Sequence, residues 1–227
     1  MGNINGASEH VTELDRQLAT VIDKGYPALA GRTVDEFAGY VEPLRAQLDH
    51  LVDGGVPGLL RFVLVIADVL VAAREAALRM ELPGGSGVTD MTADDLARFH
   101  PIDTLTVPAG PAYLLLDVDT GKDLLDVTPD DALAAIAGRG RSPLTVSEGI
   151  AVVTQFPSIL RGRNCFSLLG SRCGDRRVTA LWVSRKRPRL GWCWAGNPHT
   201  WLGSASCAGR LAAPAERASG QRVRSTR

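Results

Sequence analysis

The chain changes character near residue 160, and this change constrains its fold more than any other feature. Before it, apolar residues recur at helical spacing in several segments, and two apolar runs are typical of buried strands. From Asn164 onward, short β-type runs alternate with turns. Helices and strands do not alternate regularly, as they would in a doubly wound parallel sheet. The sequence therefore predicts an α+β fold, with a helical N-terminal part packed on a mixed or antiparallel sheet and a C-terminal β-meander.

Two T-x-x-E capping boxes mark helix starts in the first part. In each pair, Thr33 with Glu36 and Thr145 with Glu148, one side chain can satisfy the free backbone N–H of the other residue. The apolar runs FVLVI and AYLLLDV predict strands at residues 62–66 and 112–118, and the second strand is expected to return through residues 124–127 as a hairpin. Other helices are expected at 8–24, at 68–80, after Thr92, and from Thr128-Pro129 to Gly138, and the helix opened by Thr33 should kink at Pro43.

Three runs in the last third predict the meander, at residues 165–169, 178–184 and 190–194. A turn at residues 185–188 joins the last two.

The C-terminal residues 211–227 are rich in Arg, Ala and Ser and have no apolar period. We therefore expect a disordered tail there. The predicted organisation is a flexible N-terminus at residues 1–7, a single α+β domain at 8–210, and this tail. A chain that ends at Arg210 should then fold with unchanged stability.

The charges of the chain sum to zero but are segregated along it. Residues 1–160 hold 11 Lys and Arg against 23 Asp and Glu, whereas residues 161–227 hold 14 against two. Such asymmetry can indicate a basic surface for anions or nucleic acid. The interpretation we favour is that acidic helices pair with basic strands inside one fold. A nucleic-acid-associated protein is therefore a weaker alternative, and it would show binding that weakens steeply with salt.

No segment predicts a membrane span. The most apolar stretch, residues 59–73, is interrupted by Arg61 and Asp68 and is shorter than the ~20 residues that cross a bilayer. The N-terminus carries no basic, apolar export signal, so we expect a cytoplasmic protein with no membrane partner. The four cysteines, at positions 165, 173, 193 and 207, should then be thiols, and they lack the Cys-x-x-Cys pairs of structural zinc sites. The sequence predicts no metal and no cofactor.

The densest group of chemically distinctive side chains lies in LGWCWAGNPHTWLGSASC, residues 190–207. Alternation along a strand places two Trp residues on one face and Cys193 on the other, and the Asn-Pro turn brings a His and a third Trp close by. We predict a partly exposed, aromatic-walled site for a small anionic or aromatic molecule, or for a protein partner. The predicted ligand-binding residues are Trp192, Trp194, Asn197, His199, Trp201 and Arg172. The alternative is that the Trp residues fill the core and His199 fixes a turn.

An enzyme is a further alternative. It would use Cys193 or Cys165 as nucleophile and His199 as base, with Asp90 or Asp175 as orienting acids. Buried, inert thiols explain the same cysteines.

Three long blocks carry a resemblance to a known family. They are GRSPLTVSEGIAVVTQFP at residues 140–157, NCFSLLGSRCGDRRVTALWVS at 164–184, and LGWCWAGNPHTWLGSASC at 190–207. They resemble an actinobacterial domain-of-unknown-function family, and the resemblance extends from about Gly25 to Arg210. It implies no activity, cofactor or catalytic residue, so the predicted site rests on the residues alone.

Overall fold

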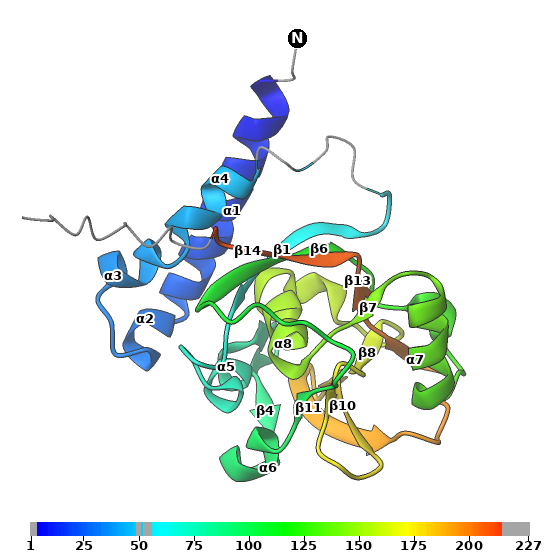
Figure 1. The fold of residues 1–227 in the computed structure, drawn as a ribbon. Helices are drawn as coiled ribbons and strands as arrows, with labels where there is room; N and C mark the ends of the chain where they lie inside the picture. Colours follow the sequence, from blue (N-terminus) through cyan, green and yellow to red (C-terminus); the bar gives the residue numbers. More distant parts are fainter. Residues whose placement is uncertain (1–3, 49–50, 52–55, 215–227) are drawn as a thin grey trace, which may run out of the picture.

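Helix α8, Val146–Gln155, lies at the centre of the fold (Figure 1). The structure is a computed structural model that describes residues 4–48, 51 and 56–214. Every residue of α8 except Ser147 is buried. A helix that is buried on all sides must be apolar almost all round, and the run Ile150, Ala151, Val152, Val153 meets that requirement. Both neighbouring sheets contribute to the core around it.

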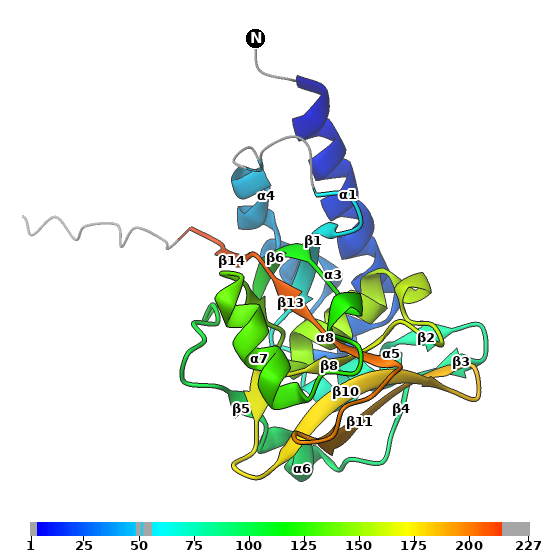
Figure 2. The same ribbon diagram turned by 90° about the vertical axis from the view of Figure 1, so that its right-hand side faces the viewer.

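One sheet that packs on α8 is antiparallel, in the order β1-β6-β14. β1 is Leu60–Ile66, β6 is Ala112–Val118 and β14 is Gly209–Ala212. The register places the last residue of β1 opposite the first residue of β6, so these two strand ends share one edge of the sheet. Figure 2 shows the C-terminal segment with β13 and β14 running along β6.

The second sheet has five strands in the order β12-β8-β10-β11-β4. It packs on α8 so closely that a Cβ added at Gly149 would lie 2.2 Å from the side chain of Leu168. β10 and β11 form a long hairpin, whose turn residues Arg185 and Lys186 have φ of 50° and 62°, as a type I′ turn requires. The strands are β12 Leu202–Ser204, β8 Cys165–Leu168, β10 Arg177–Ser184, β11 Arg187–Trp194 and β4 Val88–Thr89.

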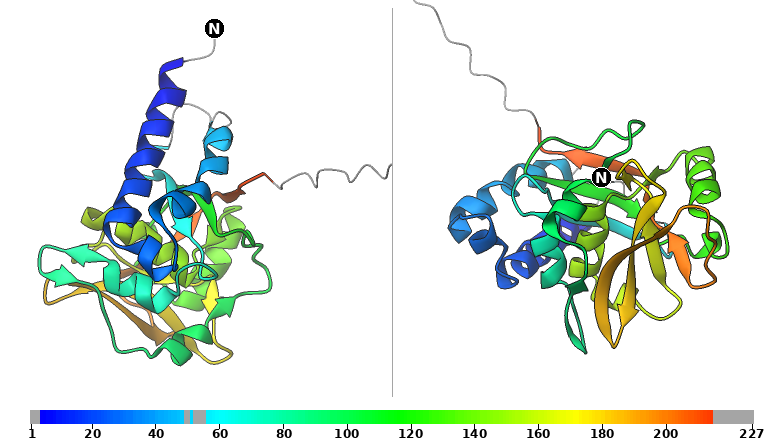
Figure 3. Two further views of the ribbon diagram at one scale, coloured as in Figure 1. Left: turned by 90° about the vertical axis from the view of Figure 1, so that its left-hand side faces the viewer. Right: turned by 90° about the horizontal axis from the view of Figure 1, so that it is seen from below.

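Helices flank both sheets, and Gln17 of α1 bonds to the open edge of β1 through Phe62 O and the Leu64 N–H. The first four gather at one end of the molecule, and the five-stranded sheet lies at the other end (Figure 3). Helix α1 packs on β1 and α8, and α7 covers the five-stranded sheet through a small second core that includes Ala132 and Ile136. The helices are α1 Ile4–Asp23, α2 Tyr26–Leu29, α3 Val34–Gly39, α4 Glu42–Leu48, α5 Ala73–Arg79, α6 Ala93–Ala97 and α7 Pro129–Gly138.

Short elements complete the chain. Two-residue strands pair as β2 Glu81–Leu82 with β3 Gly85–Ser86, β5 His100–Pro101 with β9 Ser171–Arg172, and β7 Ser142–Pro143 with β13 Ser206–Cys207. The 3₁₀ helices are η1 Lys122–Leu124 and η2 Pro157–Ile159. No helix of the described residues is both long and apolar enough to cross a membrane.

The structure confirms the α+β class, both capping boxes and the three strands of the meander. The prediction of a hairpin after β6 is wrong. Gly121, with φ of 73°, leads instead into η1, because both edges of β6 are occupied by β1 and β14. The single kinked helix is two helices, α3 and α4, and Pro43 lies in the first turn of α4, where its missing N–H removes no helical hydrogen bond.

Two expected boundaries also shift. Helix α1 begins at Ile4, so residues 4–7 belong to a helix. β14 continues to Ala212, and Leu211 and Ala212 pair with Leu114 and Tyr113 of β6. A chain ending at Arg210 would lose these pairs and is not expected to keep its full stability. Residues 1–3 and 215–227 lie outside the described residues.

A buried ion pair connects α8 to the C-terminal strand. Arg210 Nε and Nη2 donate to Glu148 Oε1 and Oε2 at 2.5 and 2.8 Å, and the two side chains are 5% and 0% exposed. Tyr113 Oη donates to the same carboxylate at 3.0 Å, and the Thr145 N–H donates to it at 2.7 Å. Arg210 also donates to Pro143 O at 3.0 Å. The Glu148–Arg210 pair thus links β6, β7, β14 and the first turn of α8.

Part of the segregated charge is neutralised within the described part of the fold. Four arginines of the basic segment each form an ion pair with an acidic residue from the first 160 residues. These pairs are Arg172–Asp130, Arg177–Asp95, Arg189–Asp90 and Arg210–Glu148. They favour internal neutralisation over a basic surface for nucleic acid.

Removing one partner of the buried pair should be strongly destabilising. Arg210→Met leaves the Glu148 carboxylate buried without its cation, and we expect a loss of about 3–5 kcal/mol in the free energy of unfolding. The double variant Glu148→Gln with Arg210→Met should recover part of that loss, because no unpaired charge then remains buried. Urea unfolding at pH 7 measures both. A single variant as stable as the wild type would contradict this role of the pair.

Candidate functional site

The aromatic residues predicted as one site divide into two clusters on opposite faces of the β10–β11 hairpin. Directly opposed residues of antiparallel strands present their side chains on the same face. Trp182 is opposed to Arg189, and Trp192 is opposed to Thr179. Because side chains alternate along β11, Trp192 and Trp194 share one face, and Trp182 lies on the other with Arg189.

The first cluster is exposed. Trp192 and Trp194 are 39% and 47% exposed, and their rings meet edge to face with centroids 4.9 Å apart. The guanidinium carbon of Arg177 lies 5.6 Å from the ring centroids of both Trp192 and Phe99. Arg177 is held there by the Asp95 carboxylate at 2.9 Å. Part of the aromatic surface is therefore accessible, as the sequence predicted.

The second cluster contains Trp182, Trp201 and His199. Trp201 is 38% exposed, and its ring centroid lies 6.4 Å from that of Trp182 and 5.5 Å from that of His199. His199 Nε2 is buried and has no hydrogen-bond partner among the described residues.

The two remaining residues of the predicted site belong to neither cluster. Asn197 is exposed, and its N–H donates to Trp194 O at 3.1 Å as part of a turn. Arg172 donates to the Asp130 carboxylate at 2.8 Å. The six predicted residues are therefore spread over two faces of the hairpin and its flanks, and they do not line one cleft.

The cysteines suggested as nucleophiles are poorly suited to that role. Burial raises the pKa of both the Cys165 and the Cys193 thiols, so their reactive thiolates are disfavoured. Cys165 Sγ lies 3.6 Å from Arg161 O, and Cys193 Sγ lies 4.0 Å from Ser167 Oγ. Neither thiol forms a hydrogen bond with His199 in the described part of the chain.

A cleft at the edge where β1 ends and α8 begins is a better candidate site. It consists of two adjoining cavities of about 320 and 290 Å³ that share Asp68, Phe99 and Pro101. We call it the Asp68 cleft. The first cavity is also lined by the start of α5 and by α6 with the residue that follows it: residues 72–74, Ala93, Leu96, Ala97 and His100. The second is also lined by the connection before β6 and by the start of α8, together with neighbouring residues: residues 107–110, Ala67, Val69, Tyr113, Thr145, Val146, Ser147 and Ser171. The walls are mainly apolar with a few polar groups, as in small-molecule sites.

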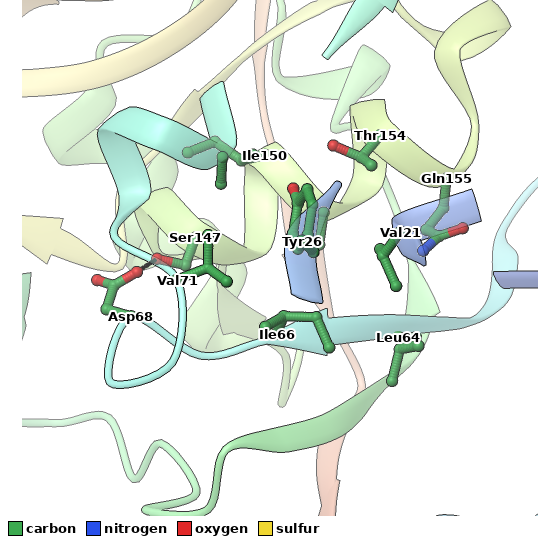
Figure 4. Close-up of a pocket in the computed structure, with 12 residues that line it drawn as sticks. Val21, Tyr26, Leu64, Ile66, Asp68, Val71, Ser147, Ile150, Thr154 and Gln155 are labelled. Atoms are coloured by element: carbon green, nitrogen blue, oxygen red, sulfur yellow. Dashed lines mark hydrogen bonds between the residues drawn. The ribbon is translucent and has the colours of Figure 1, made fainter. Parts of the chain in front are cut away.

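The polar centre of this cleft is a hydrogen bond from Ser147 Oγ to the Asp68 carboxylate (Figure 4). Asp68 lies two residues after the carboxyl end of β1, and the intervening Ala67 fixes the chain there because its N–H donates to Pro111 O at 2.9 Å. Ser147 is the second residue of α8 and the one residue of that helix that is not buried. The ends of a strand and of a helix thus place the two side chains together.

The first turn of α8 has one unused donor at this point. The Val146 N–H donates to Ser171 Oγ at 3.2 Å, and the Glu148 N–H donates to Thr145 Oγ1 at 3.4 Å. The Ser147 N–H has no such partner among the described residues. The first N–H groups of a helix point out of its N-terminal end, where the helix dipole favours negative charge. Thr145, Val146 and Ser147 all line the cleft, so this donor is available to a ligand.

Partial burial raises the pKa of Asp68 above the ordinary value for an aspartate, although the residue stays more than one-third exposed, and the negative charge of Glu148 adds to this shift. The hydrogen bond from Ser147 acts in the opposite direction. Arg74, which also lines the cleft, pairs with its neighbour Glu75 at 3.4 Å. Within the described residues no ion pair holds Asp68. A carboxylate with a raised pKa in a cleft is a candidate functional group.

A small chamber lies behind the cleft, between α8, β1 and Tyr26 (Figure 4). Asp68 and Ser147 line it as well, and its volume of about 10 Å³ corresponds to one water molecule. Thr154 and Gln155 are 2% and 3% exposed. A side-chain hydrogen bond joins Thr154 to Tyr26, whereas Gln155 Oε1 has no partner among the described residues. Buried polar atoms of this kind are usually satisfied by a bound water.

The sequence contained one signal for this cleft that was not interpreted. In the sequence, Asp68 interrupts the most apolar stretch and stands at the start of an expected helix over residues 68–80, whereas in the structure helix α5 begins only at Ala73 and Asp68 lies in the connection after β1. The residues facing it, Ser147 above all, come from a segment 79 positions further along the chain. Sequence spacing alone cannot show that two residues so far apart in the chain lie together in the fold.

The described residues contain no group of three or more His, Cys, Asp or Glu side chains that could hold a metal ion. The cysteines at positions 165, 173, 193 and 207 are all free.

Comparisons with known proteins identify a family but no activity. A family model described as "Family of unknown function (DUF5701)" matches residues 20–213. No curated protein and no solved structure matches the chain.

The raised pKa of Asp68 predicts how stability depends on pH. The ionised carboxylate is disfavoured in the folded state. The contribution of Asp68 to the free energy of unfolding is therefore greatest when the group is protonated, and it falls as the pH rises through the folded-state pKa. Asp68→Asn should therefore melt at a higher temperature than the wild type at pH 8, and this advantage should vanish as the pH falls towards 4. Thermal melts over this range test it, with the exposed Asp35→Asn as control. A lower Tm of Asp68→Asn at every pH would contradict the prediction.

Proposed function

The chain belongs to this family of unknown function, and from that premise we propose that it binds a small molecule in the Asp68 cleft. The observation that carries the proposal is that Asp68 alone lines both cavities of the cleft and the chamber behind it. Its carboxylate has a hydroxyl partner but no cation among the described residues. The ligand has an apolar body and a polar group that donates a hydrogen bond to Asp68.

The walls of the cleft support this ligand class. Phe99, Pro101, Val107 and Pro108 offer apolar and aromatic surface to the body of the ligand. A protonated amine or an amide N–H at Asp68 would replace the water that the carboxylate loses on burial. A ligand carboxylate would instead face a like charge, which costs binding energy. We therefore propose a cationic or neutral ligand rather than the anionic one that the sequence suggested.

The four free thiols fit a reducing compartment, which supports a cytoplasmic location for this binding activity.

A matched series of probes tests the proposal. Benzylamine and benzamide should raise Tm, and benzoate should not. At 100 times Kd the rise should be about 5–10 °C, because that excess contributes about 2.7 kcal/mol and each kcal/mol shifts Tm by about 2–4 °C. In Asp68→Asn the preference for benzylamine over benzoate should disappear, whereas Asp35→Asn should retain it.

Equal Tm shifts with all three probes would show that Asp68 does not select the ligand. A preference for benzylamine over benzoate that survives in Asp68→Asn would show the same. No shift with any probe would contradict the proposed cleft.

A second candidate is the binding of an aromatic molecule on Trp192 and Trp194, because both rings are more than one-third exposed. Aromatic ligands stack on such surfaces through offset or edge-to-face contacts. Indole should quench the tryptophan fluorescence saturably, and Trp194→Ala should weaken its binding about tenfold, which corresponds to an aromatic pair of about 1.4 kcal/mol. Trp201→Ala, on the other face, is the control. An equal loss in both variants would contradict binding at this cluster.

A further inference from the structure

We propose that Ser147 is a nucleophile that takes an acyl group from a carboxylic ester bound in the Asp68 cleft, with Asp68 as its base. This inference rests on the proposed function, since the ester must first bind in the same cleft. It assigns the substrate class: an ester whose apolar acyl group lies against Phe99 and Val107.

The first support is the geometry of the two side chains. Ser147 Oγ donates directly to the Asp68 carboxylate, so nucleophile and base are within hydrogen-bond reach of each other. Both side chains line the cleft, and Ser147 is only half-buried in a helix that is otherwise buried. Its hydroxyl is therefore open to a bound ester.

The second support is the donor beside the nucleophile. Attack on an ester carbonyl places negative charge on the carbonyl oxygen, and preorganised backbone N–H groups stabilise that charge. The Ser147 N–H is the one donor of the first turn of α8 that has no partner among the described residues. It lies in the same residue as the nucleophile and at the positive end of the helix dipole.

The third support is independent of the helix end. The chamber behind the pair is lined by one polar atom without a partner among the described residues, Gln155 Oε1, on a side chain that is more than nine-tenths buried. In Figure 4 the Thr154 hydroxyl points into this chamber, towards Tyr26. The chamber, which Asp68 and Ser147 also line, has room for one water that would give Gln155 Oε1 a partner.

The reaction balances with water as the only co-substrate. Ser147 Oγ forms a bond to the carbonyl carbon as its proton passes to the Asp68 carboxylate. The ester C–O bond then breaks, and Asp68 returns the proton to the leaving alcohol. A water next attacks the acyl carbon, gives a proton to Asp68, and the acid departs as Ser147 Oγ regains a proton.

A fluorophosphonate probe tests the nucleophile directly, because it forms a stable bond only with an activated serine. The full chain treated with fluorophosphonate–rhodamine should gain one adduct by intact mass, and tandem mass spectrometry of the wild type should place it on Ser147. Ser147→Ala should lose the adduct, and Asp68→Asn should react roughly 100-fold more slowly, the low end of what a general base contributes. Ser158→Ala, an exposed serine outside the cleft, should react like the wild type.

The mapped adduct decides the question even where a variant fails to fold. An adduct on another serine, or no adduct, overturns the inference. If benzamide and benzylamine still bind while no adduct forms, the nucleophile fails and the proposed binding function stands. If neither probe class engages the cleft, both fail.

Discussion

The buried pair between Glu148 and Arg210 is the interaction on which the rest of the structure depends. Glu148 is the third residue of α8, and its carboxylate closes the capping box at the start of that helix. The same carboxylate accepts from Arg210 of β14 and Tyr113 of β6. A charge buried this deeply is tolerable only when every lone pair finds a donor. The first turn of α8 therefore has one position relative to the three-stranded sheet, and Ser147 lies in that turn.

This constraint explains why the cleft lies where it does. The strand end after β1 and the start of α8 both meet the edge of the sheet that the buried pair fixes. Asp68 and Ser147 are brought together there on rigid elements, and the apolar walls come from the connection before β6 and from α6. Side chains supported in this way keep their geometry without a ligand, which is what preorganised sites require.

Local patterns in the sequence predicted the elements well, whereas long-range contacts set the site. The capping box at Thr145 and Glu148 was evident from four residues, but the second role of Glu148 depends on Arg210, 62 positions away. Alternation along β11 correctly placed Trp192 and Trp194 together. It could not show that Trp201 packs on Trp182 on the opposite face. The composition of the C-terminal segment suggested disorder from residue 211, although Leu211 and Ala212 pair with β6 and extend the sheet.

The central claim is that Asp68 and Ser147 form one functional pair in the Asp68 cleft, and a carboxyl ¹³C NMR titration of Asp68 tests it most directly. In the wild type the midpoint should lie above the ordinary aspartate value. In Ser147→Ala it should rise further, because the lost hydrogen bond stabilised the ionised form. A wild-type midpoint in the ordinary range, or one that Ser147→Ala leaves unchanged, would contradict the account.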